Sequence, residues 1–179
     1  MKIKLSLTQA KMLAEKIRAE LAPGCQRVEI AGSIRRQKQT VGDIEIVAIP
    51  KYTPSLLPEV PGQSLLDMVL EVLVIQHRLI PGDKSGQNYK NFSIPAVDDL
   101  KLDLFITTPE CWPVIFAIRT GSADFSRMLV TPKAKGGLLP SHLRVEGGRV
   151  WDNGQAIALV SEADFLELCG GWVEPPERT

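Results

Sequence analysis

Three observations on this 179-residue sequence predict an α+β fold. Apolar residues recur at helical spacing near the start of the chain. Polar and apolar residues alternate in residues 43–49 and 100–106, as they do in strands with two different faces. The expected order is a helix, two strands, a helix, three strands, and then mixed helices with a hairpin, which is the α+β class.

The first elements are a helix and two strands. Ser6 followed by Gln9 has the pattern of a capping box, and the helix that begins there is expected to end at the Pro-Gly pair at 23–24. A short strand follows at residues 28–30 and runs into a Gly-Ser turn. Residues 43–49 form the second strand, with acidic residues on one face and isoleucines on the other.

The middle of the chain predicts a loop, a helix and three strands. Residues 50–63 hold four prolines and are expected to form a loop. Ser64 is placed to cap a helix that runs to about Leu73. The strand signals that follow are weak at residues 75–80 and 88–94, and strong at residues 100–106, where leucines alternate with Lys101, Asp103 and Phe105.

The last part of the sequence predicts short helices around a hairpin. A helix is expected to open at Thr108-Pro109, because proline suits the first helical position. Ser122 is placed to cap another helix, which Pro132 should end or kink. Two glycines between short apolar runs predict a tight hairpin turn. The remaining signals are Gly147-Gly148 for that turn, Ser161 with Asp164 for the start of a last helix, and Gly170-Gly171 for its end.

Composition narrows the functional classes. The chain has 21 basic and 21 acidic residues, so it lacks the overall positive charge of most nucleic-acid-binding proteins, although a local basic patch remains compatible with it. Its three cysteines are far apart, which indicates reduced thiols and no zinc site. We find no apolar stretch long enough to span a membrane and no signal-peptide pattern. The expected location is the cytoplasm, or the nucleus or a virus-infected host cell, without secretion.

Three acidic residues suggest a metal site. Asp43 and Glu45 stand two residues apart on a strand, so their side chains point to the same face, about 7 Å apart at the backbone. Asp103 lies between alternating leucines on another strand. If the strands adjoin, each carboxylate pair at ~4 Å repels by roughly 4 kcal/mol in surroundings of dielectric near 20. Divalent cations remove that repulsion. Taken singly, each of these residues is more often an exposed strand position.

A Gly-Ser turn and an arginine pair precede the acidic strand. Gly32 and Ser33 supply backbone N–H groups and a hydroxyl that suit phosphate oxygens. Arg35 and Arg36 supply positive charge opposite a triphosphate. A Gly-Ser pair alone only marks a turn, so the prediction depends on the joint order and spacing of these residues.

Together these segments resemble DNA polymerase family X, the polymerase beta-like nucleotidyltransferases. The segment from Gly32 to Glu45 is similar to the signature of that family: Gly-Ser, an arginine pair, and then Gly-Asp-x-acid. The resemblance continues in order through residues 82–85, 101–104, 120–122 and 161–178, and covers about residues 10–178. One such motif is only moderately specific, whereas five in the right order are a strong signal.

The resemblance implies a fold and a domain division. It implies a nucleotidyltransferase palm with a mixed sheet in residues 1–107 and a small C-terminal thumb in residues 108–179. The lyase and fingers regions of the larger family members are not expected, as in the smallest viral members. A 5′-deoxyribose phosphate lyase activity is therefore not expected either.

The resemblance also implies roles for single residues. Asp43, Glu45 and Asp103 would bind two divalent ions, Mg²⁺ or Mn²⁺, and Asp103 would lie nearest the primer 3′ hydroxyl. Arg35 is expected to be structural or on the surface. The residues implied to contact the incoming nucleoside triphosphate are Gly32, Ser33, Arg36, Gly42, Ile118, Gly121 and Ser122.

The sequence departs from the family pattern at several positions. The second carboxylate is Glu45 where the family usually has Asp, which implies altered geometry for a metal that prefers a strict octahedron. Ile118 and Arg119 replace an aromatic pair that checks the sugar, so Ile118 either lines the nucleotide pocket or simply packs in the core. Ser126 stands where the family usually has Asn. These changes bear on template and sugar discrimination more than on the transfer chemistry.

The expected activity is a DNA-directed DNA polymerase of the family X type. It would add deoxynucleotides to a primer 3′ end by two-metal phosphoryl transfer, with a place in DNA repair. The expected partners are primer-template DNA and a nucleoside triphosphate, the protein acts as a monomer, and no membrane is involved. Two alternatives stay open. The first is a template-independent, terminal transferase-like nucleotidyltransferase, which the neutral net charge favours. The second is a degenerate nucleotide-binding module, and the three carboxylates argue against it.

Overall fold

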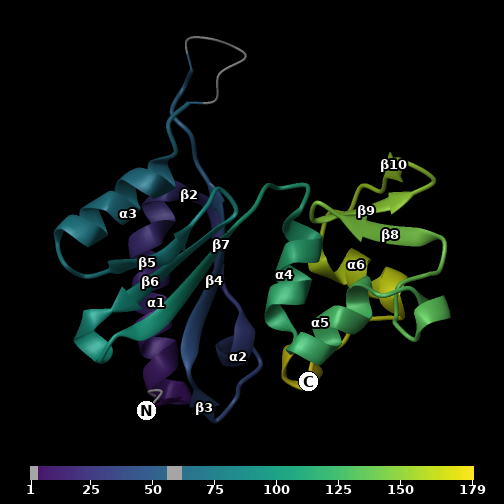
Figure 1. Cartoon of the computed structure of the whole chain (residues 1–179), viewed down its shortest axis with the longest axis horizontal. Helices are drawn as coiled ribbons and strands as arrows, with labels where there is room; N and C mark the ends of the chain where they lie inside the picture. The colour runs from purple at the N-terminus through teal and green to yellow at the C-terminus, as the bar shows by residue number, and fades with distance from the viewer. Residues whose placement is uncertain (1–3, 56–61) are drawn as a thin grey trace. The chain divides into compact units, whose positions relative to one another are not determined.

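A computed structural model describes residues 4–55 and 62–179 of the chain (Figure 1). Within these residues the chain divides into two compact units. Unit 1 comprises Met1–Ile30 and Gln39–Thr107, and unit 2 comprises Ala31–Lys38 and Thr108–Thr179. Unit 2 is therefore built from two separate stretches of sequence, the first of which lies between two strands of unit 1.

Unit 1 contains a five-stranded mixed sheet, in agreement with the α+β class. One neighbouring pair of strands is parallel, and the other three pairs are antiparallel. A separate two-stranded sheet joins β1 (Leu5–Ser6) to β3 (Thr40–Val41). In spatial order the main sheet consists of β2 (Cys25–Ile30), β4 (Asp43–Pro50), β7 (Leu100–Ile106), β6 (Tyr89–Ile94) and β5 (Ile80–Ser85).

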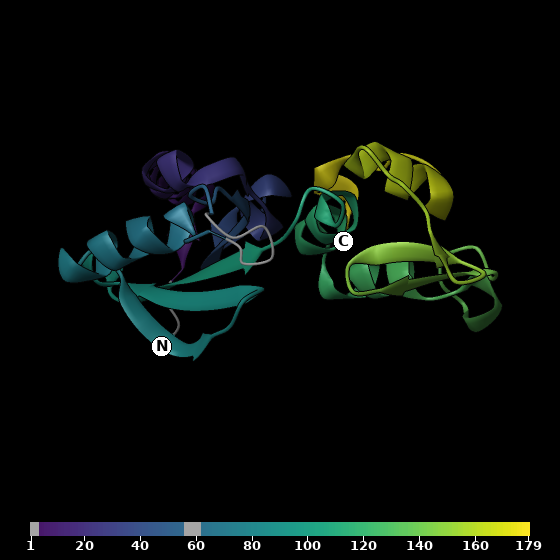
Figure 2. The same ribbon diagram turned by 90° about the horizontal axis from the view of Figure 1, so that it is seen from above.

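Two helices lie on the apolar side of this sheet (Figure 2). Helix α1 (Leu7–Leu21) packs on β2 and β4 and also contacts α3 (Leu65–Ile75). Ser6 caps α1 through the expected capping box with Gln9, and Ser64 caps α3. The side chains beneath the helices come from alternate strand positions and are fully buried: Ile44, Ile46, Leu102 and Leu104. On the opposite face the alternation places the polar residues Asp43, Glu45, Lys101 and Asp103, next to the buried Val47 and Phe105.

The strand expected at residues 75–80 is wrong. Helix α3 continues to Ile75, and the chain then turns through His77, whose φ is +54°. The strand begins at Ile80, since the left-handed backbone of His77 interrupts an extended run through residues 75–80. In the expected loop at residues 50–63, Pro50 still belongs to β4, and residues 56–61 lie outside the described part of the chain.

Unit 2 consists of short helices and a three-stranded sheet around its own core. The helices are α2 (Gly32–Arg35), α4 (Trp112–Thr120), α5 (Ala123–Val130) and α6 (Glu162–Cys169). Strands β8 (Leu143–Glu146), β9 (Arg149–Asp152) and β10 (Gln155–Ala156) form an antiparallel sheet. The core is formed by apolar side chains of these elements, among them Val114, Phe125, Leu129, Val150 and Phe165. Short 3-10 segments occur at Ala22–Gly24 and Pro95–Val97 in unit 1, and at Lys133–Lys135 and Pro175–Glu177 in unit 2.

The start expected for the first helix of residues 108–179 is also wrong. The helix α4 begins at Trp112, and Thr108 instead accepts hydrogen bonds from the backbone N–H groups of Cys111 and Trp112 in a turn. Pro113 explains the difference, because proline has no N–H to donate to a residue four positions earlier and so must stand in the first helical turn. A helix that opened at Pro109 would place Pro113 beyond that turn.

The other elements expected in residues 108–179 are confirmed. Ser122 caps α5, which ends before Pro132, and Ser161 begins α6 through a capping box with Asp164. The hairpin between β8 and β9 turns at Gly147 and Gly148, whose φ angles of +60° and +77° are those of a type I′ turn. Among the described helices none has the length and apolar character needed to cross a membrane.

Candidate functional site

The polar face of the unit 1 sheet carries the three predicted metal ligands. Strands β4 and β7 run in parallel, with Asp43 opposite Lys101 and Glu45 opposite Asp103. Residues that are opposite in a sheet point to the same face, and neighbouring strands lie about 4.8 Å apart. The register thus brings Glu45 and Asp103 together at the backbone, with Asp43 one pleat away on the same face.

Asp103 is the most enclosed of these carboxylates. It is only 7% exposed, and both of its oxygens accept hydrogen bonds. The hydroxyl of Tyr89 on β6 donates to Oδ1, and Lys101 Nζ donates to Oδ2 at 2.9 Å. The hydrogen bond to Asp103 raises the pKa of Lys101 above its ordinary value of 10.5, so the lysine stays charged and neutralises the carboxylate.

The donor set on this face suits a divalent cation, although the side chains are not gathered around one point. Carboxylate oxygens are the ligands that Mg²⁺ and Mn²⁺ prefer. Throughout residues 4–55 and 62–179, however, no three His, Cys, Asp or Glu side chains are grouped closely enough to hold a metal ion. Lys101 and Tyr89 each donate a hydrogen bond to one oxygen of Asp103. The residue types fit a divalent cation, and a cation at Oδ2 would have to displace Lys101.

The Gly32–Arg36 segment belongs to unit 2 and is held there by its arginines. Gly32 has a φ of +59°, a conformation that favours glycine, and opens the one-turn helix α2. Arg36 Nη1 donates to the carbonyl oxygens of Thr120 and Gly121, at 2.6 and 2.8 Å. The hydroxyl of Ser33 is buried and has no hydrogen-bond partner. The structure therefore joins two sequence-predicted nucleotide-binding motifs, residues 32–36 and 120–122, by direct hydrogen bonds.

Arg35 is part of a buried ionic cluster that sequence reasoning missed. Its guanidinium forms two parallel hydrogen bonds of 2.7 Å with the carboxylate of Glu162 and another of 2.5 Å with Thr120 Oγ1. Arg178 Nη1 donates to the same Glu162 carboxylate at 2.5 Å, and Arg178 is 0% exposed. Arg35 also stacks on the ring of Phe116, 4.0 Å from its centroid. Arg35 is thus structural, as expected, but through partners that nothing in the local sequence pattern singled out.

The residues around 118–122 have structural roles in unit 2. Ile118 packs against the hydrophobic core, which is one of the two roles expected for it, and its carbonyl accepts a hydrogen bond from Ser126 Oγ at 2.5 Å. A side chain on Gly121 would lie within 2.8 Å of Phe125 and Ser126, so only glycine fits there. Ser122 caps α5 by accepting from the N–H of Phe125.

The predicted residues divide between the two units. Asp43, Glu45 and Asp103 lie in unit 1, together with Gly42, around which a side chain would meet no atom within 4 Å. The other predicted nucleotide-binding residues, Gly32, Ser33, Arg36, Ile118, Gly121 and Ser122, all lie in unit 2. The metal-binding and nucleotide-binding predictions therefore fall on separate compact units of the chain.

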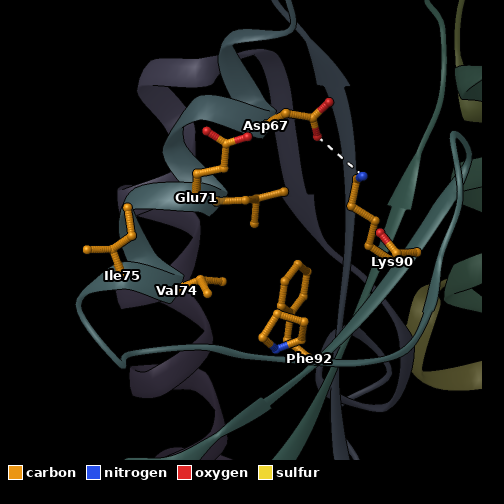
Figure 3. A pocket seen from close by; sticks show the side chains of 9 residues that line it. Asp67, Glu71, Val74, Ile75, Lys90 and Phe92 are labelled. Carbon is orange, nitrogen blue, oxygen red and sulfur yellow. Dashed lines mark ion pairs between the residues drawn. The ribbon is translucent and has the colours of Figure 1, made fainter.

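A pocket of about 530 Å³ lies on the apolar side of the unit 1 sheet, between α3 and strands β5 and β6 (Figure 3). Val74 and Phe92 line it, and Lys90 forms an ion pair with Asp67 at 3.5 Å across it. Lys90 and Phe92 alternate with Tyr89 and Asn91 along β6, so this pocket opens on the face opposite the three carboxylates. It includes none of the predicted site residues.

Comparison with known proteins leaves the family open. No protein-family model matches the chain, and no curated protein matches it.

Proposed function

We propose that the protein is a nucleotidyltransferase that transfers a nucleotide from a nucleoside triphosphate to a hydroxyl acceptor. The observation that carries the proposal is the parallel register of β4 and β7, which sets Glu45 opposite Asp103 with Asp43 on the same face. Carboxylate oxygens on neighbouring strands are the ligands that divalent cations such as Mg²⁺ and Mn²⁺ prefer.

Asp43, Glu45 and Asp103 would hold the divalent cations of the reaction. When bound, Mg²⁺ or Mn²⁺ would neutralise the carboxylates and stabilise the charge that develops on the phosphoryl oxygens. Asp103 would bind the cation through Oδ2 once Lys101 has left that oxygen, and would lie nearest the attacking hydroxyl. Its side chain is nearly buried, which fixes its direction and shields it from water.

Within unit 2, Arg36 and Ser33 are the groups that we propose to bind a nucleotide. Arg36 carries the positive charge that suits a triphosphate, and the buried hydroxyl of Ser33 is a hydrogen-bonding group in the same turn of helix. Arg36 already bonds the carbonyls of Thr120 and Gly121, so its direction is fixed before any phosphate arrives. Pre-organised groups of this kind bind with less loss of side-chain entropy.

The acceptor proposed is the 3′ hydroxyl of a DNA primer, as in DNA polymerase family X. A balanced total charge does not argue for tight non-specific binding to DNA, so we expect the acceptor to be recognised mainly at its reacting end. Template-independent extension is the second candidate. It is favoured by Ile118, which packs in the core of unit 2 and offers no aromatic ring to check the nucleotide.

Primer extension with a labelled DNA primer tests the proposal. The wild-type chain, Asp103→Asn and Asp99→Asn are each supplied with deoxynucleoside triphosphates and Mg²⁺ or Mn²⁺, on templated and on single-stranded primers. Asp99 is an exposed residue four positions before Asp103, and its φ is +60°. Asparagine also adopts this conformation, so Asp99→Asn is a matched control. We expect Asp103→Asn to abolish transfer and Asp99→Asn to retain it. Extension by Asp103→Asn at the wild-type rate would contradict the proposal.

A further inference from the structure

Tyr89 lies beside Asp103 in a fixed position on the polar face of the unit 1 sheet. In the register of β6 and β7 it stands opposite Phe105, and Asn91 stands opposite Asp103. The rings of Tyr89 and Phe105 are 5.2 Å apart at their centroids and tilted by 31°. From this position the Tyr89 hydroxyl reaches diagonally across the strands to donate a hydrogen bond to Asp103 Oδ1.

The two hydrogen bonds on Asp103 differ in how firmly they are held. Lys101 has a flexible side chain that is 50% exposed, and an ion pair of this kind contributes little stability because water and salt compete with it. Tyr89 has few rotatable bonds, and its ring is fixed by its contact with Phe105, which is buried.

We propose that Tyr89 is a positioning residue for the metal site: it holds Oδ1 of Asp103 so that Oδ2 is presented to the cation when Lys101 moves away. This inference rests on the proposed function, since it takes Asp103 to be a metal ligand. It adds a residue that no motif in the sequence indicated. It also gives the two oxygens of Asp103 different roles: Oδ1 accepts the hydrogen bond from Tyr89, and Oδ2 would bind the cation.

Removal of the hydroxyl should weaken metal binding without disturbing the sheet. Hydrogen-bonding partners of metal ligands typically change metal affinity or activity by about 10- to 100-fold when they are mutated. Tyr89→Phe keeps the ring contact with Phe105 and removes only the bond to Oδ1. We therefore expect Mn²⁺ to bind about tenfold more weakly, or worse, to Tyr89→Phe than to the wild-type chain.

The test is a titration of the whole chain with Mn²⁺ alone, with free Mn²⁺ counted by electron paramagnetic resonance. Tyr52→Phe is the matched control, because Tyr52 is the other tyrosine of the chain and is 52% exposed. Asp103→Asn is the reference for loss of the ligand itself. We expect weakened binding in Tyr89→Phe and Asp103→Asn, and wild-type binding in Tyr52→Phe.

The outcomes separate the inference from the proposed function. If Asp103→Asn weakens binding and Tyr89→Phe does not, the positioning role is wrong and the metal site stands. If the wild-type chain and Asp103→Asn bind Mn²⁺ alike, both are wrong. Thermal unfolding in a chelator serves as the control for fold, where Tyr89→Phe should match the wild-type chain. If Tyr89→Phe binds Mn²⁺ more weakly and also unfolds at a lower temperature than the wild-type chain in the chelator, Tyr89 has a structural role and the inference is wrong.

Discussion

Glu162 Oε1 accepts a hydrogen bond of 2.5 Å from Arg178 Nη1 and another of 2.7 Å from Arg35 Nη1, while Arg35 Nη2 binds Oε2. Glu162 is 8% exposed and Arg178 is fully buried. Removal of one partner from a buried ion pair leaves an uncompensated charge and costs about 3–5 kcal/mol.

We expect Glu162→Ala to lower the free energy of unfolding by about 3–5 kcal/mol, because it leaves two arginines of unit 2 without their carboxylate. Glu177→Ala, which removes an exposed carboxylate close to Arg178 in sequence, is the control and should change little. The measurement is urea denaturation followed by circular dichroism. Equal unfolding midpoints for the two variants would show that the buried cluster does not stabilise unit 2.

The same carboxylate predicts a pH dependence. Burial alone would raise the pKa of Glu162, but the hydrogen bonds and charges of Arg35 and Arg178 outweigh burial and hold the pKa below its ordinary value of 4.5. A group with a depressed pKa stabilises the fold above its unfolded pKa, and that stability is lost as the pH falls through the folded pKa. The contribution of Glu162 should therefore be complete above pH 4.5 and decline below it.

The expected result is that the wild-type chain loses stability below pH 4.5 more steeply than Glu162→Gln does. Urea midpoints measured across this range for both proteins give the comparison. Parallel curves for the two proteins would mean that other carboxylates govern the acid sensitivity of unit 2.

Lys101→Met should have the opposite effect on metal binding from Tyr89→Phe. The Lys101 ammonium occupies Asp103 Oδ2 and so competes with a cation for the same oxygen. The lysine is half exposed, so the competing pair is worth at most about 1 kcal/mol, which corresponds to an affinity gain of up to about fivefold. Mn²⁺ titration is the measurement, with Lys11→Met, an exposed lysine on α1, as the control. Weaker binding by Lys101→Met would indicate that the lysine supports the metal site.

Glu45 predicts a preference for manganese. Its side chain is one methylene longer than aspartate, and displacement of a ligand by ~1 Å can cost about a hundredfold in rate. Mg²⁺ demands near-ideal octahedral geometry. We expect nucleotide transfer to be faster with Mn²⁺ than with Mg²⁺, and Glu45→Asp to narrow the difference. Steady-state rates in the two metals test this, and an unchanged ratio in the variant would exclude Glu45 as its cause.

Ile118 predicts weak exclusion of ribonucleotides. Its side chain packs against the core of unit 2, so it provides no rigid wall beside a sugar. Discrimination by shape against one extra hydroxyl is on the order of a hundredfold. The measurement is the ratio of kcat/KM values for deoxy- and ribonucleoside triphosphates. A ratio of kcat/KM values far above a hundredfold would mean that another group excludes the ribose 2′ hydroxyl.

Since Ile118 packs in the core, we expect Ile118→Tyr to lower the free energy of unfolding by about 1–3 kcal/mol through overpacking, in addition to any gain in selectivity for deoxynucleotides.

Most of the fold could be predicted from the sequence because its signals are local. Capping residues such as Ser6, Ser122 and Ser161 satisfy backbone donors within their own helices, and the alternation in residues 43–49 and 100–106 follows directly from the pleat of a strand. The start of α4 was missed because two prolines lie four residues apart, and only the second one fits the first turn.

The candidate site could be predicted only where its residues form motifs. Asp43 and Glu45 share a strand, so their common face follows from spacing alone. The partners of Asp103 could not be found in this way. Tyr89 lies on another strand, 14 residues away, and its contact depends on the register between β6 and β7. Glu162 was likewise hidden, because a glutamate in the first turn of a helix is usually an exposed residue that complements the helix dipole.

Arg35 belongs to unit 2 but lies early in the sequence, and this restricts which segments can be exchanged between related proteins. A cut between residues 107 and 108 would seem to separate the two halves, yet it would take Glu162 and Arg178 away from Arg35, which lies 127 positions before Glu162. A chimaera that exchanged only residues 108–179 would combine Glu162 from one parent with the residue at position 35 from the other parent. Exchange between related proteins therefore has to carry residues 31–38 together with residues 108–179, so that the two stretches are inherited as one block.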